Sequence, residues 1–162
     1  MHEDQIRIRA ARVDDVEALA TFNAAMAMET EGKSLAAATL RLGVARVLAE
    51  PARGFYLIAE CADAVAGCLM VTYEWSDWRN GDWWWLQSVY VAPEHRRRGV
   101  FRALYAQIER RALENADVVG IRLYVERDNL RAQRTYAALG MAEEGYRMYG
   151  KALRADLRAA PA

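Results

Sequence analysis

Four arginines surround a single glycine in the middle of the chain, in the run Glu94-His95-Arg96-Arg97-Arg98-Gly99 and the turn after it. They are Arg96, Arg97, Arg98 and Arg102. Guanidinium groups and backbone N–H donors suit a diphosphate, and a glycine lets a ligand approach the backbone closely. A solvated basic loop, a glycine that only starts a helix, and a nucleic-acid contact are the alternatives for the same residues.

The overall charge and the missing motifs narrow these alternatives. Twenty-two basic residues balance twenty-two acidic ones among 162, and there is no second basic cluster, which disfavours nucleic acid. GxxxxGKS/T is absent, which excludes a P-loop NTPase, and GxGxxG is absent too. A composition of 54% hydrophobic and 27% charged residues is typical of a globular protein, and the length predicts one domain over residues 1–162.

The residues beside the loop predict a strand before it and a helix after it. Trp83 to Val91 is rich in aromatic and β-branched residues and stops at Ala92-Pro93. Apolar residues then recur at helical spacing from Phe101 to Ala112. The free N–H groups and the dipole of the helix start would point at a ligand in the loop, so the sequence predicts an anion site.

Alternation, capping residues and turn signals divide the rest of the chain into further elements. Strands are predicted at Gln5–Ala10, Phe55–Ala59, Val65–Tyr73, Val119–Val125 and Glu143–Leu153. Helices are predicted from Asp14 or Asp15 to the break at Glu29–Gly32, from a Ser34 cap to Pro51, from Gly99 to about Asn115, and from an Asn129 cap to Gly140. With a hairpin loop at Trp75–Asp82, the three strands from Phe55 to Val91 are expected to form an antiparallel meander. The strand at Val119–Val125 should run parallel to the Trp83 strand, because a helix connects the two. The expected fold is α/β (α+β): a mixed, mostly antiparallel sheet flanked by helices.

The sequence carries no mark of a membrane or of an oxidising compartment. The N-terminal run MHEDQIRIRA has no apolar signal-peptide core, and no segment approaches the roughly 20 apolar residues of a membrane span. Cys61 and Cys68 lack CxxC spacing and are expected to be reduced. His2 and His95 have no ligand partners at metal spacing, so no metal is expected. These observations predict a cytoplasmic protein.

Two runs of residues form recognisable motifs. The first is Arg96-x-x-Gly99-x-Phe101, and the second is Asn129-x-x-Ala132-x-x-x-Tyr136-x-x-x-Gly140-Met141. They resemble the Q/R-x-x-G-x-G/A acetyl-CoA signature and the later N-x-x-A-x-x-x-Y-x-x-x-G-F segment of the GNAT superfamily of N-acetyltransferases. Phe101 stands in place of Gly or Ala, and Met141 in place of Phe. The predicted order of elements is similar to that of the family over nearly the whole chain.

The resemblance implies acetyl-CoA as co-substrate, bound in a V-shaped cleft where the two parallel strands splay apart. The pantetheine arm would pair with the backbone of Val89 and Val91 like an added strand, and the loop N–H groups would take the diphosphate. Asn129 would face the pantetheine or thiol end. The implied cofactor-binding residues are Val89, Val91, Arg96, Arg97, Arg98, Gly99, Val100, Phe101, Arg102 and Asn129.

The resemblance also implies catalytic roles. Tyr136 stands where many members place the general acid for the leaving thiolate, and the Val89 N–H would hold the oxyanion. Glu74 or Glu29 would take the proton of the amine. Without the resemblance, Tyr136 is typical of a core tyrosine and the two glutamates of surface charges.

The expected activity is therefore direct transfer of an acetyl group from acetyl-CoA to a primary amine. Carboxylates and tryptophans near the expected acceptor loops suggest a small, cationic acceptor. A protein amino group as acceptor, and a non-catalytic CoA-binding sensor or interaction module, are the alternatives. The expected partner is a small-molecule amine, with no nucleic acid and no membrane. A homodimer through the sheet or the last strand is common in the family.

Overall fold

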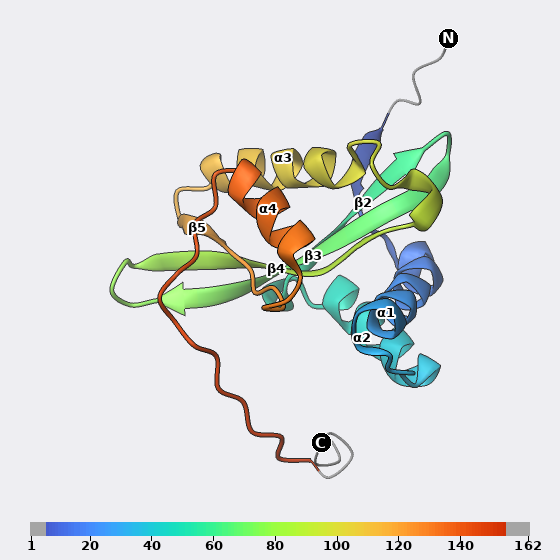
Figure 1. Ribbon diagram of the computed structural model, residues 1–162, viewed down its shortest axis with the longest axis horizontal. Helices are drawn as coiled ribbons and strands as arrows, with labels where there is room; N and C mark the ends of the chain where they lie inside the picture. Colours follow the sequence, from blue (N-terminus) through green and yellow to red (C-terminus); the bar gives the residue numbers. More distant parts are fainter. Residues whose placement is uncertain (1–5, 155–162) are drawn as a thin grey trace. The chain divides into compact units, whose positions relative to one another are not determined.

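The computed structural model describes residues 6–154 of the chain (Figure 1). Two compact units divide it, Met1–Leu123 and Tyr124–Ala162. The first unit contains the sheet and three of the α-helices, and the second contains one helix, α4 (Leu130–Ala138). A single domain over the whole chain stays a prediction. Within the described residues, no helix is both long enough and apolar enough to cross a bilayer.

The first unit is built on a five-stranded sheet in the order β1-β2-β3-β4-β5. Its strands are β1 (Arg7–Ala10), β2 (Phe55–Cys61), β3 (Ala64–Ser76), β4 (Gly81–Val91) and β5 (Val118–Arg122). Neighbours from β1 to β4 run antiparallel, and β5 runs parallel to β4 after a helical crossover. The predicted mixed sheet, with its meander and one parallel pair, is confirmed.

Helices cover both faces of this sheet. The helices α1 (Val16–Glu31) and α2 (Ala37–Ala49) pack on the face that carries Tyr56, Ile58 and Cys68. The helix α3 (Val100–Leu113) packs on the opposite face, where Val100 lies against Gly67. Alternate residues of each strand therefore serve two separate apolar layers, as the two-residue period of a strand requires.

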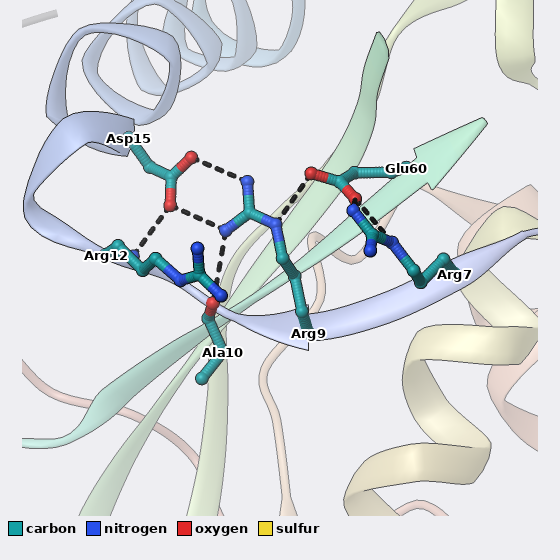
Figure 2. A network of polar contacts seen from close by, with 6 residues as sticks. All are labelled: Arg7, Arg9, Ala10, Arg12, Asp15 and Glu60. Atoms are coloured by element: carbon teal, nitrogen blue, oxygen red, sulfur yellow. Dashed lines mark hydrogen bonds and ion pairs between the residues drawn. The ribbon is translucent and has the colours of Figure 1, made fainter. Parts of the chain in front are cut away.

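A network of charged side chains joins the start of α1 to the edge of the sheet (Figure 2). Arg9 donates from Nη1 and Nη2 to the two carboxylate oxygens of Asp15, at 2.7 and 2.8 Å, and from Nε to Glu60 at 2.6 Å. Arg7 donates to the other oxygen of Glu60 from Nε, at 2.8 Å. Asp15, which the sequence offered as a helix cap, occupies the N-cap position of α1 but uses its carboxylate in this network. The network fixes where α1 begins.

Several predicted bounds and one predicted strand are wrong. The strand β5, for example, ends at Arg122 rather than at Val125. The second helix begins at Ala37 rather than beside Ser34, and its N-cap residue, Ala36, makes no side-chain cap. The strands β3 and β4 extend into the predicted hairpin loop, because cross-strand pairs continue to Ser76↔Gly81. No strand forms at 143–153, which is irregular. Alternation alone does not make a strand, because the backbone groups also need a paired neighbour.

Candidate functional site

The basic loop turns sharply into α3 at Gly99. Its φ of +86° lies in the left-handed region, and Val100 then begins the helix. Alternating left- and right-handed residues make successive N–H groups converge, which is a geometry that binds anions. An added Cβ on Gly99 would meet only Ile6 Cδ1, at 4.0 Å, so the position needs glycine for its conformation and not for lack of space.

The strand β4 leads into this loop with one free edge. Pairing with β5 runs from Asp82↔Val118 to Trp85↔Arg122, and no pair with β5 follows it among the described residues. The segment 86–91 therefore pairs with β3 on one side only. Such an edge exposes backbone N–H and C=O groups that a peptide-like ligand can join as an added strand.

A β-bulge interrupts β4 within that segment. Met70 pairs with Gln87 and Cys68 with Tyr90, so Ser88 and Val89 together lie opposite the single residue Leu69. Ser88 has a φ of +49°. The extra residue reverses the alternation of β4, and Tyr90 therefore joins the apolar layer beneath α1.

Glu29, at the end of α1, is bound to the strand and to the basic loop. Tyr90 donates its hydroxyl to Oε1 at 2.8 Å, and Arg96 donates from Nη2 to Oε2 at 2.7 Å. Arg96 also donates from Nε to the carbonyl of Val91 at 2.8 Å. The hydrogen bonds from Tyr90 and then Arg96 lower the pKa of Glu29. The Arg96 guanidinium therefore links the end of α1 to the end of β4.

Glu74 lies at the other end of the same sheet face, near β5. The indole N–H of Trp85 donates to one carboxylate oxygen, and Arg122 Nη1 lies 3.1 Å from the other. The Arg122 guanidinium stacks 3.7 Å from the ring centre of Trp83. Like Glu29, Glu74 therefore has an arginine beside its carboxylate. The positive charge of this arginine offsets the negative charge that would attract a cationic acceptor.

The tryptophans divide between packing and exposure. Trp84 is buried beside Phe55, with ring centres 5.3 Å apart, whereas Trp78 is 86% exposed at the tip of the β3–β4 hairpin. Trp75 is also exposed, so these two tryptophans are available to a ligand or partner.

The other residues of the predicted cofactor site occupy distinct places. Arg97, Arg98 and Arg102 are exposed on the loop and the first turn of α3. Val100 is buried, and the ring of Phe101 lies beside Tyr105, with centres 6.2 Å apart. The bulky residue at the variant motif position thus packs along α3, and its backbone keeps the course of the helix.

Asn129 and Tyr136 belong to the second unit, which the structure describes by itself. Asn129 caps α4 as predicted, because its Oδ1 accepts the N–H of Ala132 at 3.1 Å. Gly140 has a φ of +84° just after the helix, also as predicted. Burial raises the pKa of the Tyr136 hydroxyl, which is therefore protonated at neutral pH. Their roles at the cofactor stay predictions.

Sequence reasoning missed two residues of the site, Tyr90 and Arg122. Each acquires its role from the bulge in β4 or from a partner that is distant in the sequence. Neither a bulge nor a distant partner produces a local sequence pattern. Both cysteines are buried thiols, and the described residues contain no group of three or more His, Cys, Asp or Glu side chains that could hold a metal.

Three features described above are typical of an acyltransferase fold. They are the sheet with one parallel pair, the edge of β4 at 86–91 that does not pair with β5, and the turn at Gly99. The chain matches the model of the Acetyltransferase (GNAT) family over residues 20–141. It belongs to this family, and the expectation drawn from the two motifs is confirmed. A search of curated proteins gave no match.

Solved structures give the same result. A possible acetyltransferase from Clostridium difficile 630 is 44% identical, with a TM-score of 0.86 over 92% of this chain and 98% of that one. A predicted acetyltransferase with acetyl-CoA from Clostridium acetobutylicum is 16% identical, with a TM-score of 0.74 over 91% and 96%. A ribosomal-protein-alanine N-acetyltransferase from Brucella melitensis biovar Abortus 2308 is 16% identical, with a TM-score of 0.72 over 92% and 100%. The last two show similarity of fold alone.

Proposed function

We propose that this protein transfers the acetyl group of acetyl-CoA to a primary amine on a small acceptor. The observation that carries the proposal is the continuity of β4 with the glycine turn. An unpaired strand edge at 86–91 leads directly into converging N–H groups at Gly99. A ligand with an amide-containing arm and a diphosphate matches both features.

The residues present fit such a co-substrate. Val89 and Val91 lie on the segment of β4 that has no partner in β5, and they offer backbone groups to the pantetheine amides. The N–H groups around Gly99, Val100 and Phe101 would hold the diphosphate. Arg97, Arg98 and Arg102 are exposed on the loop and the first turn of α3 and would add charge. The resemblance of the second motif adds Asn129 as a further contact.

Acetyl-CoA supplies an activated acyl group, and the protein positions and protonates the reacting atoms. The amine nitrogen bonds to the acetyl carbon as the carbon–sulfur bond breaks. The backbone N–H of Val89 stabilises the charge on the carbonyl oxygen. Tyr136 gives its hydroxyl proton to the leaving sulfur and regains one from solvent.

The proton of the amine goes to a carboxylate, directly or through water. Glu29 is the weaker candidate, because the hydrogen bonds that it accepts from Tyr90 and Arg96 lower its pKa. We therefore assign the base to Glu74 and give Glu29 a role in holding the loop. The arginine beside each carboxylate favours an acceptor that is less cationic than a polyamine.

A non-catalytic CoA-binding module is the second candidate. The specific observation in its favour is that both carboxylates already have arginine partners. Such a protein needs the turn and the strand edge, but has no need of an acid at the sulfur.

The test is release of free CoA from acetyl-CoA in the presence of a panel of amines. We expect turnover with at least one amine, and a fall of about a hundredfold in kcat for Tyr136→Phe. The control is Tyr105→Phe, which alters a buried tyrosine of α3 and should leave the activity of the protein unchanged. Binding of acetyl-CoA without turnover on any amine would favour the module. If saturating acetyl-CoA does not raise the Tm, both candidates fail.

A further inference from the structure

The bulge in β4 holds a side-chain-bearing residue in a strained conformation. Ser88 has a φ of +49°, which costs free energy for any residue other than glycine. Neither Ser88 nor Val89 has a residue partner in the ladder with β3. Something must therefore hold the chain in this shape, because a regular strand would be the less strained alternative.

Three elements supply the contacts. The Cys68 thiol on β3 donates to the Ser88 carbonyl at a sulfur–oxygen distance of 3.5 Å. The Tyr56 hydroxyl on β2 lies near the Ser88 side chain, and this contact opposes the rise in the pKa of Tyr56 that burial causes. Asn23 on α1 donates from Nδ2 to the Tyr56 hydroxyl at 3.3 Å. We call Asn23, Tyr56 and Ser88 the bulge support.

The groups beneath the bulge stay neutral. Burial raises the pKa of Tyr56, and it raises the pKa of Cys68 to about 12. The hydroxyl and the thiol therefore remain protonated donors throughout the physiological pH range. The groups that contact the bulge are therefore neutral, and their contacts are insensitive to pH and to salt.

Asn23 is retained at a cost in stability. It is 9% exposed, and its Oδ1 is buried without a hydrogen-bond partner in the part of the chain that the structure describes. A buried polar atom of this kind destabilises a fold, and an apolar residue of the same size would avoid the penalty. The benefit of an asparagine here must therefore come from its hydrogen bond to Tyr56.

We propose that Asn23 and Tyr56 are positioning residues that hold Ser88 at its positive φ, so that the N–H of Val89 points out of the ladder toward the acyl carbonyl. This inference rests on the proposed acetyl transfer. It adds two residues that never touch the co-substrate. They act through the shape of β4 on the one donor that meets the developing oxyanion.

The first test is Tyr56→Phe, which keeps the ring and removes the hydroxyl. We expect kcat to fall about tenfold, because a misdirected oxyanion donor loses part of its effect. The KM for acetyl-CoA should stay within about threefold, since the strand edge and the glycine turn remain. The control Tyr105→Phe, on the opposite face of the sheet, should change neither parameter.

The second test is rescue. Glycine adopts a positive φ without strain, so Ser88→Gly should restore most of the kcat lost in Tyr56→Phe. If the Tyr56 hydroxyl had a purely structural role, Ser88→Gly would not restore kcat, because a glycine at this position does not replace the contacts that Tyr56→Phe removes. Absence of rescue would overturn the proposal.

The third test separates function from stability. Asn23→Leu removes the orphaned oxygen, so the Tm should be unchanged or higher while kcat falls about as far as in Tyr56→Phe. Full activity in Asn23→Leu would overturn the proposal.

Amide hydrogen exchange at Val89 reports on the bulge without turnover. It should change in Tyr56→Phe and return toward wild type when Ser88→Gly is added. If the wild-type protein turns over no amine, the proposed function fails. In that case the exchange data still test whether Asn23 and Tyr56 shape the bulge. An unchanged exchange rate at Val89 in Tyr56→Phe would exclude this role.

Discussion

The Glu29 carboxylate lies 2.7 Å from the Arg96 guanidinium, although the two residues are 67 positions apart. The pair links the last turn of α1 to the loop that precedes α3. Tyr90 shares the same carboxylate from the strand between them. One glutamate thus connects the segment expected to border the acceptor with the segment proposed to hold the diphosphate.

Glu29→Gln tests whether this residue holds the loop or accepts a proton. The ion pair is partly exposed, and such pairs contribute about 0–1 kcal/mol, so the free energy of unfolding should fall by no more than that. We expect kcat to stay within about threefold of wild type, while loss of a general base would cost about a hundredfold or more. Glu31→Gln is the matched control, because Glu31 pairs with Lys33, two residues further along the chain. A hundredfold fall in kcat would instead identify Glu29 as the general base.

Gly99→Ala tests the anion site. The φ of +86° penalises an L-residue by roughly 1–2 kcal/mol, and relaxing it would turn the N–H groups apart. We expect the Kd for acetyl-CoA, measured by calorimetry, to rise at least about tenfold.

Gly43→Ala provides the contrast for that experiment. Gly43 lies inside α2, where an added Cβ meets nothing within 4 Å. Alanine there should stabilise the protein by up to about 1 kcal/mol and leave the Kd unchanged. Equal Kd values for the two variants would argue against a ligand at the Gly99 turn.

The network in Figure 2 predicts a dependence of stability on pH. Its hydrogen bond to Arg9 lowers the pKa of Asp15, and bonds to Arg9 and then Arg7 lower the pKa of Glu60. The folded state therefore binds these protons less readily than the unfolded chain. Its stabilisation is complete above the unfolded pKa of about 4 and is lost as the pH falls through the lower folded values.

Urea midpoints at pH 7 and pH 3 measure this effect. Wild type should lose stability over that interval, and Arg9→Gln should lose less because its carboxylates titrate closer to their ordinary values. Arg41→Gln, which removes an exposed pair with Glu17, should follow wild type. Parallel behaviour of Arg9→Gln and wild type would contradict the assignment.

Gly120→Ala tests the close packing of β5 against Trp83. An added Cβ would come within 2.3 Å of the indole ring, which must then move along with the Arg122 guanidinium stacked on it. We expect a loss of about 1–3 kcal/mol in unfolding free energy and a changed tryptophan emission spectrum. Unchanged emission and stability would mean that the ring has room to shift.

Local signals in the sequence predicted much of the fold. Gly140 adopts the positive φ that its place after a helix suggested, and Asn129 caps its helix. Each of these depends on residues within one turn of the chain. The parallel pairing of β5 with β4 followed from the helix between them.

The features that the sequence could not predict depend on distant partners. The bulge at Ser88 has no local signature, because it arises from how β4 fits β3 and the layer beneath it. The partners of Glu29 and Glu74 come from other strands and from the loop. The expected strand at 143–153 had the alternation of a strand, but a strand also requires a neighbour.

The burial of both cysteines has a practical consequence for measuring turnover. A thiol reacts as its thiolate, and Cys68 has a pKa of about 12 in the core, so the native protein should be inert to disulfide reagents. Colour developed by such a reagent would then report the released co-substrate alone. Any signal approaching two equivalents per chain without substrate would count unfolded molecules, so each assay would contain its own measure of sample integrity.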